Sequence, residues 1–91
     1  MTDGLNADAV WRRIVTHSGE TFHQMRGKAF TYEARGRTIR LHTTTWMISR
    51  TAIEKALERV PLTNTVVVQD LPAPSYIYGI LMDDRIQRDE W

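Results

Sequence analysis

The clearest pattern of hydrophobic and polar positions lies in the middle of the chain, where the two kinds alternate on either side of Gly36. This alternation predicts a β-hairpin with strands at about 28–34 and 37–43 and a two-residue loop, Arg35-Gly36. One face of both strands is then apolar and the other polar, and a slip of the register by one residue would destroy this match. The expected pairs across the hairpin are Ala34 with Arg37, Tyr32 with Ile39, and Phe30 with Leu41.

Two further segments, at about 6–16 and 50–60, carry apolar residues at helical spacing. Asn6 is a good N-cap for the first helix, and Pro61 cannot continue the second. Each helix has one apolar stripe and therefore needs a surface to pack on. The apolar face of the hairpin provides that surface, so the pattern predicts an α+β fold with both helices on one face of an antiparallel sheet.

The start of the second helix has two interpretations. With Ser49 as N-cap, Ile48 and Ile53 can pack together as a hydrophobic staple. With Thr51 as N-cap, Thr51 and Glu54 form a capping box. The staple favours Ser49, because Ile48 needs burial.

The remaining segments give weaker signals. A short strand is expected within 20–25, and the β-branched run at 65–69 predicts another strand. The segment 75–82 fits either a helix or a strand. A short helix is favoured, because Ser75 can cap it and Asp83 follows it. The sheet is therefore expected to have three or four strands.

The composition is that of an ordinary globular domain. The chain has 91 residues, of which 42% are hydrophobic and 25% charged, so residues 1–91 are expected to form a single domain. The absence of cysteine excludes disulfides and thiolate metal sites. No apolar run approaches the roughly 20 residues that span a bilayer. The start of the sequence, 1–5, lacks the basic and apolar regions of a secretory signal, which predicts a cytoplasmic protein without membrane contact.

The net charge of +1 conceals an uneven distribution. Residues 12–50 carry eight basic and two acidic side chains, whereas residues 51–91 carry four basic and seven acidic ones. Arginine pairs with phosphate through a planar fork, and a helix start such as Ser49-Arg50 offers free N–H groups to an anion. We therefore expect a small binding domain that contacts the phosphates of DNA or RNA. The residues expected to contribute are Arg12, Arg26, Lys28, Arg35, Arg37, Arg40, Ser49 and Arg50.

Catalysis and metal binding find little support in the sequence. Glu20 and His23 have the Glu-x-x-His spacing of di-iron bundles, but the further carboxylates of such a site are not identifiable. His17 fits the end of a helix, and His42 fits the surface of a strand. No phosphate loop, nucleophile elbow or dinucleotide motif is present, and the adjacent Asp83-Asp84 pair points in two directions. We therefore expect neither an enzyme nor a cofactor or metal.

The alternative function is a protein-interaction or homo-oligomerisation module without a nucleic-acid role. Trp46 and Met47 lie between the hairpin and the second helix, and Tyr76, Tyr78 and Trp91 offer further aromatic surface. The aromatic residues can equally complete the small core. This core interpretation is favoured for Trp46 and Tyr76 over Trp91.

Two runs of residues carry a resemblance to small bacterial domains of unknown function, over most of the chain after Gly19. The resemblance implies a bacterial intracellular origin and brings no catalytic residues. The runs are Ser49-Arg50-x-x-Ile53-Glu54-Lys55-Ala56-Leu57 and Pro74-Ser75-Tyr76-x-Tyr78-x-Ile80-Leu81-x-Asp83.

Overall fold

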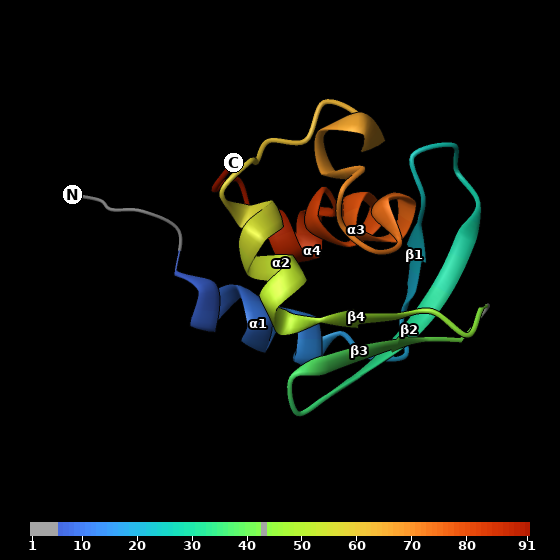
Figure 1. Ribbon diagram of the computed structural model, residues 1–91. Coiled ribbons are helices and arrows are strands. Elements are labelled where there is room, and N and C mark those ends of the chain that lie inside the picture. Colours follow the sequence, from blue (N-terminus) through green and yellow to red (C-terminus); the bar gives the residue numbers. More distant parts are fainter. Residues whose placement is uncertain (1–5, 43) are drawn as a thin grey trace.

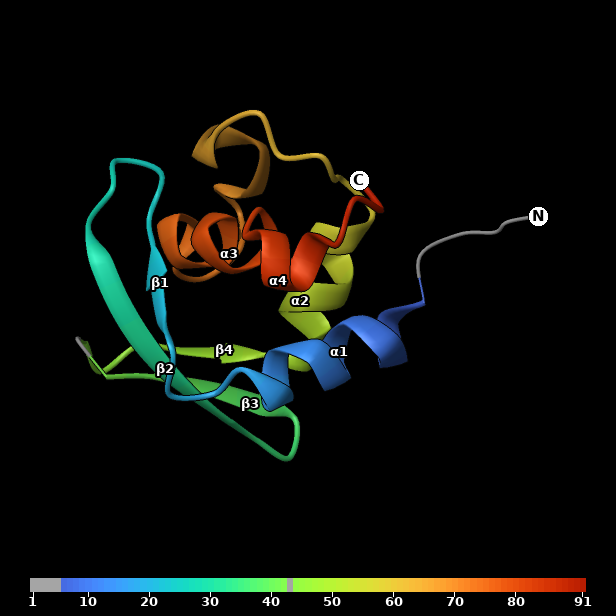
Figure 2. The same cartoon turned by 180° about the vertical axis from the view of Figure 1, so that it is seen from behind.

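The computed structural model describes residues 6–42 and 44–91 and has the expected α+β fold, with a four-stranded antiparallel sheet in the order β1-β2-β3-β4. The helices lie together on one side of this twisted sheet (Figures 1 and 2). The strands are β1 (Thr21–His23), β2 (Ala29–Arg35), β3 (Thr38–Leu41) and β4 (Met47–Ser49). The helices are α1 (Ala7–Thr16), α2 (Arg50–Leu57), the 3₁₀ helix η1 (Thr65–Val68), α3 (Pro74–Leu81) and α4 (Asp84–Gln87). Two predictions fall outside the described residues: the end of the hairpin at Thr43, and the absence of a secretory signal at 1–5.

The hairpin of β2 and β3 forms, but its predicted pairing is wrong. Ala34 pairs with Ile39 and Tyr32 with Leu41, so the loop is Gly36-Arg37. Gly36 has φ +62°, and Arg37 is not among the residues with positive φ. A two-residue hairpin loop in which only the first residue has a positive φ requires glycine at that first position. Gly36 is therefore the first loop residue, and the loop lies one residue later than predicted. Each strand residue meets a partner two positions away from the expected one, so the apolar residues still share one face.

The N-caps predicted for the first two helices, Asn6 and Ser49, are confirmed. The Asn6 side chain accepts hydrogen bonds from the first turn of α1, and the Ser49 hydroxyl oxygen accepts one from the Ala52 amide at 3.1 Å. Helix α2 ends at Leu57, three residues before the predicted end. The amides of Glu58 and Arg59 bond carbonyls three residues back, so the chain tightens into a 3₁₀-like turn before Pro61.

The predicted strand at 65–69 is wrong, because this segment forms η1. Its backbone bonds locally: the Asn64 side chain accepts from the Val66 amide, and the Gln69 amide donates to the Val66 carbonyl. With its hydrogen bonds met in this way, the β-branched run does not need a partner strand. Helix α3 confirms the helical interpretation of 75–82, but its predicted cap is wrong. The helix begins one residue earlier, at Pro74, with Ala73 as the N-cap and no side-chain cap, because proline suits a first helical position that has no amide to satisfy.

The core lies between the sheet and the helices. Tyr32 is fully buried, and its hydroxyl donates to the Ile14 carbonyl of α1 at 2.6 Å. Burial raises the pKa of Tyr32 above its ordinary value. Helix α3 packs closely on β1, where a Cβ at Gly79 would lie 2.5 Å from the His23 carbonyl oxygen. Within the described ranges, no helix has the length and apolar character to cross a membrane.

The expected order of burial for the tryptophans is reversed. Trp46 is 56% exposed and immediately precedes β4, whose start extends beyond the helices (Figure 1). Trp91 is half-buried, and its indole N–H donates to the Leu81 carbonyl at 2.8 Å, so α4 brings the C-terminal residue back onto α3. Tyr76 packs edge-on against Phe30 with ring centroids 4.9 Å apart, as its core interpretation predicts.

Candidate nucleic-acid interface

The side of the sheet turned away from the helices carries part of the predicted basic set. Side chains alternate along β2 and β3, and Tyr32, Ala34, Ile39 and Leu41 take the covered side. Glu33, Arg35 and Arg40 therefore project from the opposite side, which we call the outer face. Arg37 follows Gly36 in the connecting loop, next to the start of β3, and is exposed.

The outer face contains two adjoining hollows that share Glu33, Arg40 and Met47. One has a volume of about 480 Å³ and extends to His42, Thr44 and Thr45, and the other has a volume of about 220 Å³ and extends to Arg35 and Thr38. Together they make one shallow depression over β2, β3 and β4, with basic and hydroxyl side chains along it.

The outer face has more positive than negative charge. Glu33 accepts a hydrogen bond from Arg35 Nη2 at 3.0 Å, with both side chains exposed. Arg40 stands opposite Glu33 in the register of β2 and β3. Among the described residues, neither Arg37 nor Arg40 forms an ion pair. Arg35 and Arg40 against Glu33, with Arg37 in the adjoining loop, leave a local excess of positive charge. The exposed Arg35–Glu33 pair is weak and open to exchange with another anion.

Ser49 and Arg50, the predicted phosphate site at a helix start, are engaged within the protein. The Ser49 hydroxyl caps α2, and the Arg50 guanidinium bonds Asp8 of α1 and, at 3.0 Å, Glu54 of α2. Arg50 also lies 5.9 Å from the centre of the Trp11 ring. The hydrogen bonds to Asp8 and then Glu54 raise the pKa of Arg50. These contacts join α1 to α2, and a phosphate would have to displace them.

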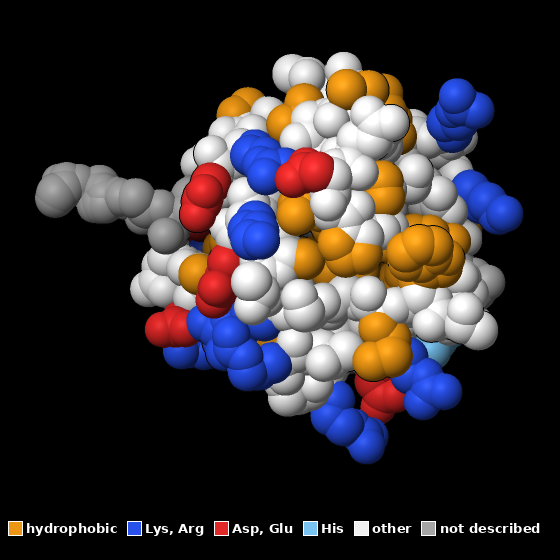
Figure 3. Space-filling model, viewed as in Figure 1, with side chains coloured by type: hydrophobic (Ala, Val, Ile, Leu, Met, Phe, Trp, Pro, Cys, Tyr) orange, Lys and Arg blue, Asp and Glu red, His pale blue; other side chains and the backbone are white. Residues whose placement is uncertain are grey.

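The remaining predicted residues lie elsewhere. Arg26 and Lys28 belong to the turn between β1 and β2, at the opposite end of β2 from Arg35 and Arg37. Arg12 is exposed on α1. Basic side chains accordingly occupy separate places around the molecule, several of them beside acidic ones (Figure 3). The structure thus brings together Arg35 and Arg40, with Arg37 in the adjoining loop, and does not join all eight predicted residues into one surface.

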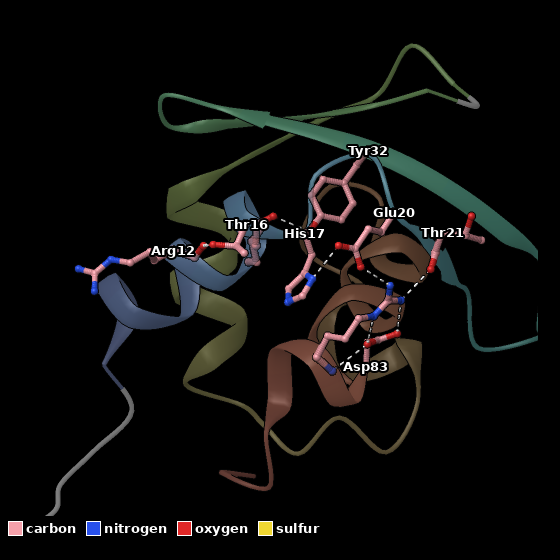
Figure 4. Close-up of polar contacts among 9 residues, drawn as sticks. Arg12, Thr16, His17, Glu20, Thr21, Tyr32 and Asp83 are labelled. Carbon is pink, nitrogen blue, oxygen red and sulfur yellow. Dashed lines mark hydrogen bonds and ion pairs between the residues drawn. The ribbon is translucent and has the colours of Figure 1, made fainter.

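A second polar cluster, absent from the predicted set, links the end of α1 to the start of α4. His17 Nδ1 lies 3.0 Å from Glu20 Oε2, and Figure 4 shows the two side chains pointing toward each other. Arg85 donates to Glu20 at 2.8 Å, to both Asp83 oxygens, and to the Thr21 carbonyl. Its guanidinium also lies 3.9 Å from the centre of the Phe22 ring.

The acidic side chains of this cluster are bonded to its basic ones. Hydrogen bonds from His17 and then Arg85 lower the pKa of the Glu20 carboxyl, and the hydrogen bond from Arg85 lowers that of Asp83. Arg85, whose own pKa is raised chiefly by Asp83, is surrounded by acceptors. The cluster therefore holds the C-terminal helices against α1 and β1, and it leaves Arg85 little capacity for a ligand.

Residues 6–42 and 44–91 hold no group of three or more His, Asp or Glu side chains suited to a metal ion. No protein-family model, curated protein or solved structure matches the chain.

Sequence reasoning missed two features of these surfaces. His17 and Glu20 are three positions apart in the sequence, which is the spacing of neighbours on a helix. The Glu-x-x-His pattern relates Glu20 only to His23, which lies on β1. Met47 is predicted only as an interface residue. It precedes the buried Ile48 in β4, and because side chains alternate along a strand, it lies on the outer face. Both features depend on where β1 and β4 begin, and sequence patterns define such boundaries poorly.

Proposed function

We propose that this protein is a non-enzymatic binding domain that contacts the phosphates of a nucleic acid through the outer face of its sheet. Arg35, Arg37 and Arg40 are the residues that would bind phosphate. The hydroxyls of Thr38, Thr44 and Thr45 would add hydrogen bonds beside them.

The observation that carries this proposal is an uncovered sheet face with an excess of arginine. Phosphate and sugar oxygens receive half or more of the hydrogen bonds in protein–DNA complexes, chiefly from arginine, lysine and hydroxyl side chains. Arg37 and Arg40 make no ion pair with another described residue, so their guanidinium groups reach a phosphate without displacing an internal carboxylate. The shallow depression around Arg40 and Met47 adds a surface on which a nucleic-acid strand can lie.

The test is a titration of labelled single- and double-stranded DNA and RNA by fluorescence anisotropy, at about 50 and 200 mM salt. The matched variants are R37A/R40A, which removes two charges from the outer face and its adjoining loop, and R12A/K55A, which removes two from α1 and α2. For duplex DNA, each phosphate contact contributes about −0.9 to the slope of log affinity against log salt. We expect R37A/R40A to reduce this slope by about two units and R12A/K55A to leave it unchanged.

Two results would refute the proposal. One is the absence of binding to any of the four probes at the lower salt concentration. The other is an equal loss of affinity in both double variants, which would show that binding follows net charge and has no location on the outer face.

A second candidate function, self-association, is favoured by the exposed apolar residues of β4. Trp46 and Met47 are each 56% exposed, and β4 pairs on one side only, with β3. Hydrophobic side chains also gather over α3 and beside β4 (Figure 3). An unpaired strand edge next to apolar surface is suited to pairing with a second copy. Light scattering tests this candidate: a dimer that W46S/M47S converts to a monomer supports it, and a monomeric native protein at high concentration excludes it.

A further inference from the structure

A cleft distinct from the outer face lies between the turn connecting β1 to β2 and the segments that begin η1 and α3. Its volume is about 570 Å³, which is within the usual range for small-molecule sites. Half-buried polar side chains and two exposed basic ones line it. These residues are Gln24, Asn64, Thr65 and Ser75, with Arg26 and Lys28.

The backbone of the turn is closed by its own hydrogen bonds. The Gln24 amide donates to the Lys28 carbonyl at 2.9 Å, and the Gly27 amide donates to the Gln24 carbonyl at 2.8 Å. Gly27 has φ +89°, a conformation that glycine adopts without the strain of a side chain. The turn therefore holds Arg26 and Lys28 beside the same cleft.

The two cations of the cleft lack a counter-charge. No Asp or Glu lines the cleft, and neither Arg26 nor Lys28 forms an ion pair with another residue of the described ranges. Other arginines of the protein are bound to carboxylates, as Arg13 is to Glu90 and Arg85 to Asp83. Two like charges beside one polar cleft repel each other, and an anion bound between them would relieve that repulsion.

We propose that this cleft binds a phosphorylated small molecule of about nucleotide size. Arg26 and Lys28 would pair with the phosphate, the arginine through its planar fork and the lysine as a point charge. The hydroxyls of Thr65 and Ser75 would donate further hydrogen bonds to its oxygens. The Met25 side chain, 48% exposed at the cleft, would pack against the organic part of the ligand.

This inference does not rest on the proposed nucleic-acid function. The cleft lies at the β1–β2 turn, whereas Arg35, Arg37 and Arg40 lie toward the other end of β2. Either site can fail without affecting the other.

The test is a titration of the full-length, isotope-labelled protein with inorganic phosphate, pyrophosphate and ATP, followed by amide chemical shifts. We expect saturable shifts confined to residues 24–28, 64–65 and 75. In R26Q/K28Q the affinity is expected to fall by at least about tenfold, because each charge-assisted hydrogen bond contributes that much or more. R12Q/K55Q, with the same change in net charge on α1 and α2, is expected to keep the native affinity. All four substituted residues are exposed, and the spectrum of each variant reports directly whether it is folded.

The three probes distinguish the source of the phosphate. Tighter binding of ATP than of pyrophosphate supports a nucleotide-like ligand that uses Met25. Equal binding of ATP and pyrophosphate would contradict a ligand of nucleotide size. The inference is overturned if none of the probes gives saturable shifts at the cleft. It is also overturned if R26Q/K28Q and R12Q/K55Q weaken binding equally.

Discussion

Gly79 lies in the interior of α3, where the structure and helix propensity predict opposite effects of the substitution G79A. Alanine is the best helix former, and glycine in a helix interior costs about 1 kcal/mol relative to it. From propensity alone, G79A should stabilise the protein. In the folded structure, however, a Cβ at Gly79 would lie 2.5 Å from the His23 carbonyl oxygen and 2.9 Å from an edge atom of the Phe30 ring.

The closer of these two contacts decides the magnitude. The Phe30 ring can rotate slightly, but the His23 carbonyl belongs to β1, whose backbone is held by its pairing with β2. Relief therefore requires α3 to move away from β1. Overpacking of a core costs about 1–3 kcal/mol, and a backbone contact is expected at the upper end of that range. After subtraction of the propensity gain, G79A should lower the free energy of unfolding by about 2 kcal/mol. In a domain of this size, that corresponds to a melting temperature lower by roughly 8–16 °C.

Urea unfolding followed by circular dichroism measures this change. We expect G79A to lower the midpoint at an unchanged m-value. T51A is the control, because Thr51 is an exposed residue of α2 and its replacement should change stability by no more than about 0.7 kcal/mol. If G79A raised the midpoint, or changed it as little as T51A, the close approach of α3 to β1 would be disproved.

Further predictions concern single contacts. Y32F removes the hydroxyl that donates to the Ile14 carbonyl at 2.6 Å, and urea unfolding should show a loss of about 1–2 kcal/mol; an unaltered midpoint would count against this buried bond. N6A removes the cap of α1 and should cost about 1 kcal/mol, whereas N6D should retain most of the stability, and similar losses in both would contradict a capping role. The pKa of Asp83 is lowered by Arg85, so its contribution to stability is present above the unfolded pKa and disappears as pH falls through the folded one. Melting temperatures should therefore decrease below about pH 4, and R85M should flatten this part of the profile; an identical profile would exclude the contact.

The elements of this fold that follow from local rules were predictable from the sequence. Asn6 and Ser49 cap their helices because short polar side chains satisfy the first amides of a helix wherever that helix packs. The apolar alternation around Gly36 likewise predicted which faces of β2 and β3 are buried. Alternation with a period of two determines which side chains share a face of a strand. Shifting the loop by one residue moves every cross-strand partner by two positions, so the same side chains still share a face. The exact partners across the hairpin were therefore decided by the conformation of Gly36.

The tertiary structure decided where charges meet and which apolar side chains are covered. In the sequence, Arg50 is one more basic residue of a positive segment. In the fold, the packing of α1 beside α2 brings Asp8 to it across 42 positions. The burial of Trp46 and Trp91 is the reverse of the predicted order. Helix α4 returns Trp91 to the core, whereas the start of β4, next to Trp46, extends beyond the helices (Figure 1). Such pairings depend on contacts between residues distant in the chain, and neither periodicity nor composition carries information about those contacts.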